Sequence, residues 1–424
     1  MIYEIRDPVH GLVSFNGLEK SIIDSQPFQR LKNIHQLSWT HYVYPGATHT
    51  RFEHSIGVMH NVTRFIERLR SYPDDSETRK ILDTYFPDKD EFIRLRKIFR
   101  LAGLLHDIGH APFSHASEEL FPDLSGKKMA HEDYTDVIIR RELKEIFENS
   151  FDRGLNEYNI QAYEVADAYS GKDPKWVFLK ELLDGPIDAD RCDYLLRDSL
   201  HLGVRYGIFD LERMINTMVL YVSDHEESEN LSMVHIDETG KDSAASLIIA
   251  RHMMFSQVYF HKTRRIFDHH YTSIMKEFLK YRFDQEKFPD NVDDYLSIDD
   301  VDVLSFMKSN LDVSRTILKR DHLRFVYDLN DHNDVEITEM KRYLEENDIA
   351  HYIDYQYKYS YMKPKNMGKD EIFIYNNNMK RRQPLSKCYT GLKEFRMNFK
   401  RLYVEKDKKE EVSKWLKRKT PEKR

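Results

Sequence analysis

Histidine and aspartate residues gather at the end of one apolar stretch of this chain. The segment LAGLLHDIGHAPFSH, residues 101–115, carries His106, Asp107, His110 and His115. Its apolar first part indicates a buried helix, on which His110 would lie one turn after His106. Pro112 should help to end that helix, so that His115 projects from the next segment. A buried imidazole beside a buried carboxylate is costly unless a cation or another partner compensates it, so this corner is a candidate metal site.

Two further segments carry residues that could complete such a site. THTRFEHSIGVMHN places Arg51 and His54 at the start of another predicted helix. IDADRCDYLLRDSLHLG carries four aspartates, which are Asp188, Asp190, Asp193 and Asp198. Imidazole and carboxylate ligands suit a divalent transition metal such as iron, manganese, zinc or nickel, and four of them leave positions for water and phosphate. A bound divalent ion lowers the pKa of water and offsets charge at phosphorus, so these residues indicate phosphate hydrolysis.

The elements that must position these residues are predicted to be mostly helical. From Glu53 to about Asp284, apolar residues return at intervals of three and four residues between short breaks. The clearest predicted helices are Phe92–Leu105, Asp133–Phe147, Ile160–Ala168 and a long run, Ser243–Lys280. The long run contains no proline or glycine and would approach roughly ten turns if unbroken.

Two regions are predicted to contain β-strands. Between Met218 and Ile236, the segments MVLYV and LSMVHI flank the polar DHEESEN, which indicates a hairpin insert. After about Arg320, the segments RFVYDL, HYIDYQYKY and DEIFIYN are rich in β-branched and aromatic residues and surround a predicted helix, Glu336–Glu346. We therefore expect a mainly α fold with a helical core and hairpin insert over residues 1–320, and a smaller α+β region over residues 321–424. A short amphipathic helix around Trp415 is expected near the end.

The composition limits the class of protein. The chain is 40% hydrophobic and 32% charged, as in a globular protein with a charged surface. It shows neither a signal peptide nor a long apolar stretch, so we expect a cytoplasmic protein with no membrane segment. Cys192 and Cys388 are too few for a disulfide framework or a thiolate zinc site. The net charge of −7 argues against a general nucleic-acid coat, although a local basic groove stays open.

Taken in order, these segments resemble the HD-domain phosphohydrolases, and within them the deoxynucleoside triphosphate triphosphohydrolase branch. The matching segments are DPVHG (7–11), DSQPFQRLKNIHQL (24–37), YVYPGATHTRFEHSIGV (42–58), AGLLHDIGHAPFSH (102–115), HED (131–133), IDADRCDYLLRDSLHLG (187–203) and RHMMFSQVYFHKTR (251–264). They cover about the first 270 residues, and the C-terminal third matches only loosely. The resemblance implies a helical fold and hydrolysis of a deoxynucleoside triphosphate to deoxynucleoside and triphosphate.

The resemblance also implies which residues perform the reaction. As metal ligands it gives His54, His106, Asp107 and Asp190. A water activated by this metal would attack the α-phosphorus in line with the 5′ oxygen, with magnesium or manganese accompanying the triphosphate. His115 resembles the general acid for the leaving oxygen, and Glu118 could orient it if a helix continues there. His131 with Glu132 is the second candidate, and His110 would contact phosphate or tune a ligand.

Further positions resemble contacts to the nucleotide. The phosphate-binding positions are Arg51, Arg191, Arg251 and Lys262. Tyr259 resembles an aromatic residue packed against the 2′ carbon of the sugar, where a ribose hydroxyl would clash. The other sugar contacts would be Gln36, Leu37, Tyr194 and Asp198. Phe260 stands where a family member has glutamine, so the hydrogen bonds offered to sugar or base differ and the preferred base stays open.

A regulatory site is the last feature that the resemblance implies. Asp24, Gln29 and Lys32 match a site for an activating guanine nucleotide, GTP or dGTP, between subunits of family members. Tyr3 replaces a lysine there, which leaves the activator open. A homo-oligomer, dimer or tetramer, is therefore expected.

Two other functions stay open at the level of the sequence. The same metal centre could act on nucleoside monophosphates, cyclic nucleotides or nucleic-acid ends, because a fold does not fix a substrate. Alternatively, the chain could be a nucleotide-sensing or single-strand-binding protein with little turnover, since its basic C-terminal tail and abundant tyrosines could contact phosphates and stack bases. The complete ligand set and the negative net charge argue against the second alternative.

Overall fold

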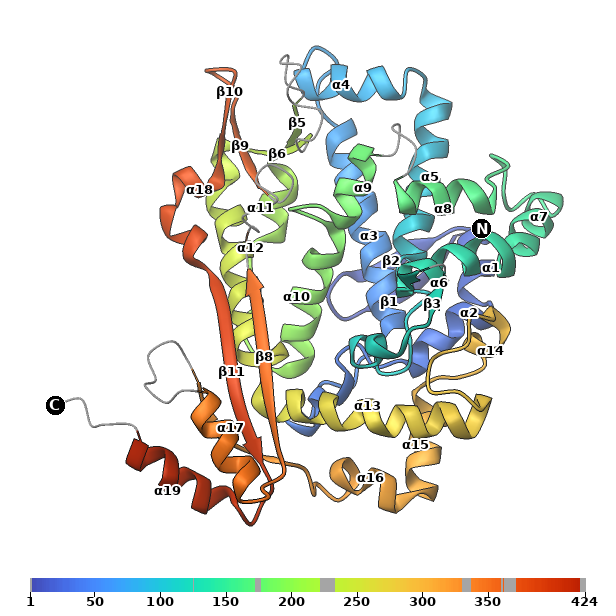
Figure 1. The fold of residues 1–424 in the computed structure, drawn as a ribbon. Coiled ribbons are helices and arrows are strands. Elements are labelled where there is room, and N and C mark those ends of the chain that lie inside the picture. Colours follow the sequence, from blue (N-terminus) through green and yellow to red (C-terminus); the bar gives the residue numbers. More distant parts are fainter. Residues whose placement is uncertain are drawn as a thin grey trace.

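Helices make up most of the molecule. The computed structural model describes residues 2–124, 126–171, 177–221, 233–329, 337–359, 361 and 371–419. Figure 1 shows a helical body with a long ribbon along its side, in which β8 (His351–Tyr359) pairs with β11 (Arg396–Val404). The predicted mainly α fold is confirmed. Within the described ranges, no helix is both long enough and apolar enough to cross a membrane.

The helices fall into those around the candidate site and those that support them. Around the site lie α3 (Arg51–Arg70), α5 (Lys89–Leu105), η3 (Ser114–Leu120), α6 (His131–Val137), α10 (Ala189–Leu202), α12 (Lys241–Met254), η8 (Phe255–Tyr259) and α13 (Lys262–Phe283). The supporting helices are α1 (Gly17–Ile23), α2 (Gln26–Gln29), η1 (Arg30–Asn33), η2 (Ser38–Tyr42), α4 (Glu77–Tyr85), η4 (Ile138–Glu142), α7 (Lys144–Asp152), α8 (Ala162–Ser170), α9 (Val177–Asp184), α11 (Leu211–Asn216), η7 (Glu238–Gly240), α14 (Val292–Leu296), α15 (Asp300–Ser309), α16 (Leu311–Leu318), α17 (Ile337–Glu346), α18 (Leu385–Cys388), η10 (Thr390–Glu394) and α19 (Lys409–Lys419).

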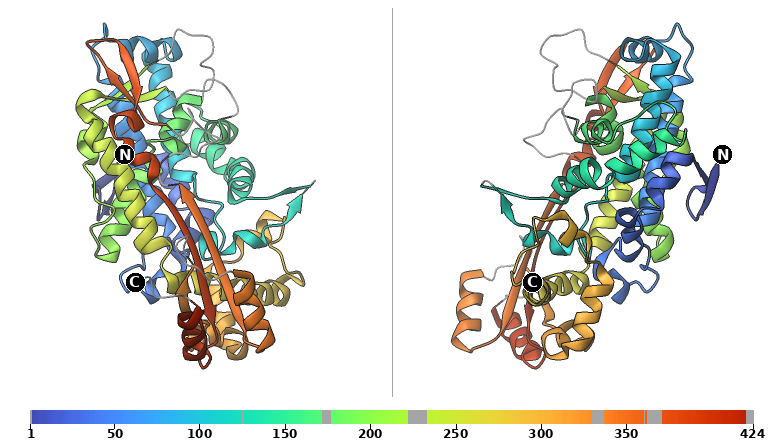
Figure 2. Two further views of the ribbon diagram at one scale, coloured as in Figure 1. Left: turned by 60° about the vertical axis from the view of Figure 1, so that its left-hand side comes forward. Right: turned by 90° about the vertical axis from the view of Figure 1, so that its right-hand side faces the viewer.

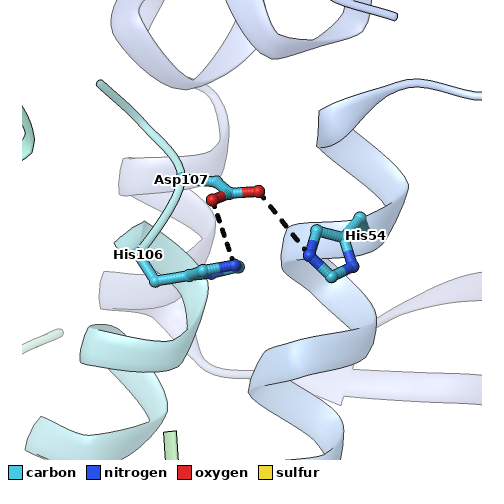
Figure 3. A group of neighbouring side chains, drawn as sticks. All are labelled: His54, His106 and Asp107. Atoms are coloured by element: carbon cyan, nitrogen blue, oxygen red, sulfur yellow. Dashed lines mark ion pairs between the residues drawn. The ribbon is translucent and has the colours of Figure 1, made fainter. Parts of the chain in front are cut away.

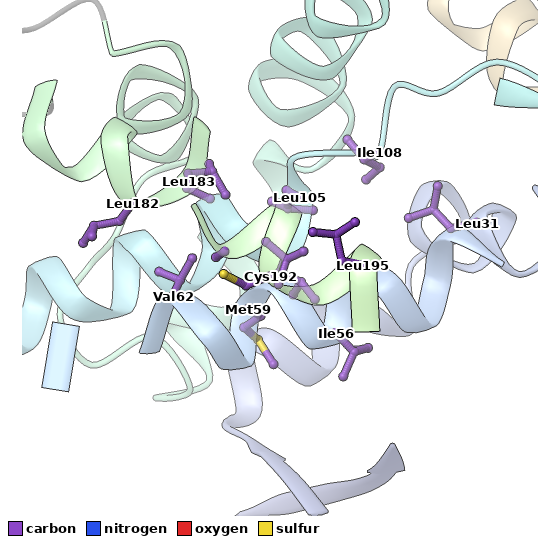
Figure 4. Packing of buried hydrophobic residues seen from close by; sticks show 14 of the residues in the cluster. Leu31, Ile56, Met59, Val62, Leu105, Ile108, Leu182, Leu183, Cys192 and Leu195 are labelled. Atoms are coloured by element: carbon purple, nitrogen blue, oxygen red, sulfur yellow. The ribbon is translucent and has the colours of Figure 1, made fainter. Parts of the chain in front are cut away.

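The core lies where α3, α5 and α10 pack against one another. Met59 and Val62 of α3 face Leu105 of α5 and Cys192 of α10 in Figure 4, and all four are almost fully buried. Each such aliphatic side chain contributes about 1.5–3 kcal/mol when it leaves water. A Cβ on Gly103 would lie 3.1 Å from Val62, so glycine lets α5 approach α3 closely. This packing fixes three of the elements that carry the predicted metal ligands.

Three predicted helices have different bounds in the structure. The predicted helix Phe92–Leu105 does end at Leu105, but it begins at Lys89, and His106 is its C-cap, so the helical turn expected between His106 and His110 does not form. The run Ser243–Lys280 is divided, because α12 leads into the π-helical turn η8 and α13 begins only at Lys262. The expected helix Asp133–Phe147 is divided in the same way by the π-helical turn η4. Periodicity alone did not reveal these breaks, since residues on both sides of each one continue the apolar spacing.

The β-structure joins distant parts of the chain. Strands β5 (Met218–Leu220) and β6 (Val234–Asp237) pair antiparallel, as predicted for the insert, and residues 222–232 of its turn lie outside the described residues. Strand β9 (Phe373–Asn376) pairs parallel with β6 and antiparallel with β10 (Arg381–Pro384). The two predicted regions therefore share a sheet, and the boundary near residue 320 stays a prediction.

The remaining strands lie at the margins of the helical body. β7 (Arg324–Asp328), β11 and β8 form an antiparallel sheet in the order β7-β11-β8, and a small second core packs it on α17 and α19. The helix predicted around Trp415 is α19. The hairpin of β1 (Tyr3–Asp7) and β2 (Gly11–Phe15) lies on the opposite side of the body from the β8–β11 ribbon in the right-hand view of Figure 2. Two short paired strands of two residues each, β3 (Asp123–Leu124) and β4 (Lys127–Lys128), project beside the site helices.

Candidate metal centre

The four side chains predicted to be metal ligands meet in one place. His54 comes from α3, His106 and Asp107 follow α5, and Asp190 lies in the first turn of α10. Figure 3 shows the two carboxylate oxygens of Asp107 directed at the two imidazoles, with His54 Nε2 at 3.6 Å and His106 Nε2 at 3.3 Å. Asp190 Oδ1 lies 3.0 Å from His54 Nε2 and 3.9 Å from His106 Nε2. His54, His106 and Asp107 each place one ligand atom here, and these three atoms lie within 4.8 Å of one another.

The hydrogen bonds of the two imidazoles leave the same nitrogen available on each ring. His54 Nδ1 donates to Asp193 Oδ2 over 2.7 Å, and His106 Nδ1 donates to the Gly103 carbonyl over 2.9 Å. With the protons on Nδ1, each Nε2 carries a lone pair. Both Nε2 atoms are buried and have no hydrogen-bond partner within the described part of the chain. Two lone pairs and two carboxylates facing one point form a donor set that fits a divalent transition metal.

The charges around this point favour a cation. Burial alone would lower the pKa of His54, but the nearby carboxylates of Asp190 and Asp193 raise it to about 10. Burial would raise the pKa of Asp107, yet the Arg51 guanidinium and the nearby imidazoles hold it well below its usual range. Without a bound proton or metal ion, the cluster therefore carries a net negative charge. When bound here, a divalent ion would activate water and offset negative charge on a phosphate.

Local features of the sequence set the starts of α3 and α10. The backbone N–H of Thr50 donates to Glu53 Oε1 over 3.1 Å and fixes the start of α3, so Arg51 and His54 lie in its first turn. The Asp188 side chain accepts from the Arg191 N–H over 2.6 Å and begins α10 two residues before Asp190. Aspartate is a preferred N-cap residue, and the Asp188 carboxylate also lies 3.4 Å from the Arg191 side chain.

A second group of side chains adjoins the first through Asp107. His110 Nε2 lies 3.2 Å from Asp107 Oδ1, and the His110 ring stacks on His131 with centroids 4.0 Å apart. Glu118 Oε1 accepts from His115 Nδ1 over 2.5 Å and lies 3.5 Å from His131 Nδ1. Burial would raise the pKa of Glu118, but the two imidazoles lower it below its usual value. Burial would lower the pKa of His131, but Glu118 raises it.

Both expected pairs of this second group are present, and one further contact joins them. The predicted His115–Glu118 contact forms, although η3 is a 3-10 helix rather than a continuation of α5. His131 was expected to act with Glu132, which lies 3.4 Å away, but it also faces Glu118. One carboxylate thus faces both candidate general acids. Their catalytic roles stay predictions.

A strained turn brings His115 toward the centre. Phe113 and Ser114 both have φ of +55°, a left-handed conformation that costs non-glycine residues about 1–3 kcal/mol. The Phe113 N–H donates to Asp300 Oδ1 over 2.6 Å, and its ring stacks on Trp39 with centroids 4.1 Å apart. These contacts offset the strain and reverse the chain between His110 and His115, whose side chain is 59% exposed.

The candidate sugar-binding residues form a neighbouring cluster. The Tyr259 hydroxyl donates to Asp198 Oδ2 over 2.6 Å, and His49 Nε2 donates to the other oxygen of Asp198 over 2.7 Å. The rings of Tyr194 and Tyr259 meet edge to face with centroids 6.1 Å apart. Asp198 is only 1% exposed, and it holds Tyr259 in place, while its role as a sugar contact stays a prediction.

The candidate phosphate-binding cations are distributed unevenly. Arg51 lies at the metal cluster, where its Nη1 is 2.5 Å from Asp107 Oδ2. Arg191 and Arg251 are close enough to Tyr194 to lower its pKa, although burial raises that pKa to about 12 overall. Lys262 lies elsewhere, with its ammonium 4.7 Å from the Phe325 ring centroid.

Other predicted residues have separate surroundings. Gln36 is buried, and its Oε1 has no hydrogen-bond partner among the residues that the structure describes, while the neighbouring Leu37 is partly buried. Of the predicted regulatory residues, Asp24 pairs with Lys20, Gln29 donates to the Ile23 carbonyl over 2.7 Å, and Lys32 lies over the Phe52 ring. Each of these three has its own partner, and their regulatory role stays a prediction.

Sequence reasoning did not assign roles to two residues that hold this site. Asp193 was named among the four aspartates of IDADRCDYLLRDSLHLG without a role of its own, and the structure places it behind His54. His49 was not singled out, and it holds Asp198. The spacing of Asp190 and Asp193, one helical turn apart, could have indicated two carboxylates on one face of α10.

Comparison with known proteins gives two family matches and several relatives. The HD domain family matches residues 51–198, and the HD associated region matches residues 209–419. An uncharacterized protein of Methanocaldococcus jannaschii is 34% identical over 304 residues, which cover 72% of this chain and 54% of that protein. The deoxynucleoside triphosphate triphosphohydrolase SAMHD1 homolog of Dictyostelium discoideum is 35% identical over 217 residues, covering 50% of this chain and 38% of its own length. This chain spans about half the length, or less, of these curated relatives.

A solved structure matches almost the whole chain. It belongs to a hypothetical protein from Aquifex aeolicus, with a TM-score of 0.75 and 30% sequence identity. The match covers 98% of this chain and 100% of the other.

Proposed function

This chain belongs to the HD-domain phosphohydrolase family, and we propose that it hydrolyses deoxynucleoside triphosphates to deoxynucleosides and triphosphate. The observation that carries this proposal is the convergence of two lone-pair imidazole nitrogens, on His54 and His106, with the carboxylates of Asp107 and Asp190. The relative from Dictyostelium discoideum, whose name gives this activity, supports the choice of substrate.

In this proposal the four residues hold a divalent ion that supplies an activated water. Arg51, already 2.5 Å from Asp107, would turn its guanidinium toward a phosphate once the ion compensates that carboxylate. Arg191 and Arg251 would neutralise more distant phosphates from α10 and α12, and Lys262 would need to leave the Phe325 ring to join them. Magnesium or manganese would accompany the triphosphate.

A proton donor must protonate the 5′ oxygen as it leaves. His115 and His131 are the candidates, because both face Glu118, and a carboxylate partner orients an imidazole and stabilises its charged form. His110 lies between this pair and Asp107, where it can donate a hydrogen bond to a phosphate oxygen. Its contacts with His131 and Asp107 would also hold the proton donor at a constant position relative to the metal.

Selection of deoxyribose would follow from the Tyr259 cluster. The hydrogen bond to Asp198 fixes the Tyr259 ring, and Phe255 meets that ring edge to face with centroids 4.9 Å apart. A ring held on two sides cannot move aside for a 2′ hydroxyl, so ribonucleotides would be rejected sterically. Gln36, Leu37 and Tyr194 would complete the sugar contacts.

Regulation by nucleotide is a further part of the proposal. Asp24, Gln29 and Lys32 would bind GTP or dGTP between subunits of a dimer or tetramer. If so, an activating guanine nucleotide should raise turnover of a second deoxynucleotide and shift the sedimentation coefficient. Unchanged turnover and sedimentation with either nucleotide would refute this part alone.

Product analysis tests the main proposal. Each deoxynucleoside triphosphate, alone and in pairs, is incubated with purified protein and Mg²⁺ or Mn²⁺, and products are resolved by anion-exchange chromatography. Deoxynucleoside and tripolyphosphate are expected in equal amounts. Release of pyrophosphate or orthophosphate instead, or turnover confined to monophosphates, cyclic nucleotides or nucleic-acid ends, would contradict it. Salt-dependent oligonucleotide binding without any turnover would favour a sensing or single-strand-binding function.

A further inference from the structure

The side of His54 that faces away from the candidate metal site is held by a buried network. His54 Nδ1 donates to Asp193 Oδ2 over 2.7 Å. Arg197, one turn along α10, donates to both oxygens of the same carboxylate over 2.8 Å each. The side chains of Asp193 and Arg197 are fully buried. Because a bidentate guanidinium fixes both the position and the rotation of a carboxylate, Asp193 presents a rigid acceptor to His54.

The remaining donor to Asp193 comes from the N-terminal hairpin. His10, in the turn between β1 and β2, donates from Nε2 to Asp193 Oδ1 over 2.7 Å. Asp7, at the start of the same turn, has its Oδ2 2.8 Å from Nη1 of Arg197. Its Oδ1 accepts the backbone N–H groups of Val9 and His10 over 2.8 Å each, which shapes the turn. The DPVHG segment therefore contacts both members of the Asp193–Arg197 pair.

A glycine on α3 makes room for this network. A Cβ on Gly57, one turn after His54, would lie 1.9 Å from Asp193 Oδ1 and 2.4 Å from Nη2 of Arg197. The carboxylate and guanidinium thus occupy the space that a side chain would need. Glycine at this position lets α10 approach α3 closely enough for Asp193 to reach the imidazole.

We infer that His10 and Asp193 are positioning residues for metal binding, and that His10 fixes Asp193 so that the His54 Nε2 lone pair points toward Asp107 and Asp190. This inference rests on the proposed metal site. A carboxylate behind a ligating imidazole sets its tautomer and raises its basicity, and loss of such a partner weakens metal binding. In this protein the Asp193 carboxylate is itself held by a second imidazole, that of His10, which belongs to the β1–β2 hairpin outside the helical core.

Metal affinity tests the inference directly. His10→Ala removes one of the donors to Asp193 and leaves the four proposed ligands in place. Its dissociation constant for Mn²⁺, measured by competition with a chelating dye, should rise by about 10- to 100-fold with an unchanged circular dichroism spectrum. Turnover should fall at limiting Mn²⁺ and recover at saturating Mn²⁺. His10→Gln, whose amide can donate to the same oxygen, should regain part of the affinity.

A matched variant separates this contact from general docking of the N-terminal region. Glu19 holds that region to α5 through a buried ion pair with Arg100, over 2.6 Å, and does not contact Asp193. Glu19→Gln should lower the melting temperature and leave Mn²⁺ affinity unchanged. Equal weakening by Glu19→Gln and His10→Ala, or wild-type affinity in His10→Ala, would overturn the inference while leaving the proposed function intact. Failure of the wild-type protein to bind Mn²⁺ would overturn both.

Discussion

At the scale of single residues, an unpartnered imidazole nitrogen is not by itself a sign of a metal site. Both ring nitrogens of His235 are buried without hydrogen-bond partners among the described residues, and burial lowers its pKa to about 3. His54 differs because two carboxylates face it, and they raise its pKa to about 10 against the effect of burial. The direction of the shift separates a histidine that stays neutral from one whose surroundings require a positive charge.

The first prediction at this scale concerns Asp107. Asp107→Ala removes the carboxylate that faces both candidate imidazole ligands, so metal content by atomic absorption and turnover should both be lost while the helical circular dichroism spectrum remains. Asp83→Ala is the control, because Asp83 pairs with Arg70 and Arg79 and is not among the residues that meet at the site. Normal turnover by Asp107→Ala would refute the proposed centre.

The second prediction concerns discrimination between sugars. Tyr259→Ala removes the ring that Asp198 and Phe255 hold, so the ratio of kcat/KM for a ribonucleotide to that for its deoxy counterpart should rise by about tenfold or more. Tyr259→Phe keeps the ring and loses only the hydrogen bond, so its ratio should change less. An unchanged preference in Tyr259→Ala would remove the steric argument.

At the scale of elements, the site depends on places where helices stop or approach one another. A Cβ on Gly109 would lie 2.3 Å from the His131 carbonyl and 2.5 Å from the Thr135 backbone nitrogen, so only glycine lets the turn after α5 pack on α6. The π-helical turn η8 likewise adds a residue before Phe260 and turns Tyr259 toward Asp198. π-helical turns of this kind are frequent at functional sites.

Gly109→Ala tests this element contact. Because backbone atoms would have to move, α6 should shift, with a destabilisation of about 1–3 kcal/mol in urea denaturation and a lower kcat as His131 leaves its position. Gly391→Ala is the control, since a Cβ there would meet nothing within 4 Å. Wild-type kcat in Gly109→Ala would show that the position of α6 does not matter for the reaction.

At the scale of the whole molecule, one sheet links the C-terminal third to the hairpin insert of strands β5 and β6. His235 of β6 lies in this sheet, with its ring stacked on Phe373 of β9 at a centroid distance of 5.3 Å. Residues from both predicted regions therefore bury this histidine together. Protonation of His235 should therefore weaken the packing between these two regions.

This arrangement predicts a dependence of stability on pH. The His235 pKa is about 3 in the folded protein and 6.5 in a free chain, so between these values only the unfolded chain binds the proton. The free energy of unfolding should therefore fall as pH falls below 6.5, by about 1.4 kcal/mol per pH unit. His235→Phe should remove this part of the slope in urea titrations between pH 7 and 5. Identical slopes in both proteins would contradict the assignment.

Local sequence patterns were enough to identify the residue types of the site and most of the elements that carry them. The motif around His106 and Asp107, and the helix beginning at Arg51, could be predicted because their signals are local: apolar spacing, capping residues and a proline. The hairpin strands β5 and β6 and the helix near Trp415 were predictable for the same reason.

Which side chains face one another could not be predicted from local patterns, because it depends on how the helices pack. Helical periodicity shows that Asp190 and Asp193 share a face of α10, but it could not show that one lies at Nε2 of His54 and the other at Nδ1. The sharing of Glu118 by two histidines and the pairing of β9 with β6 were equally hidden. These contacts join residues far apart in the chain, so they depend on how closely whole helices pack, which glycines such as Gly57 and Gly109 permit.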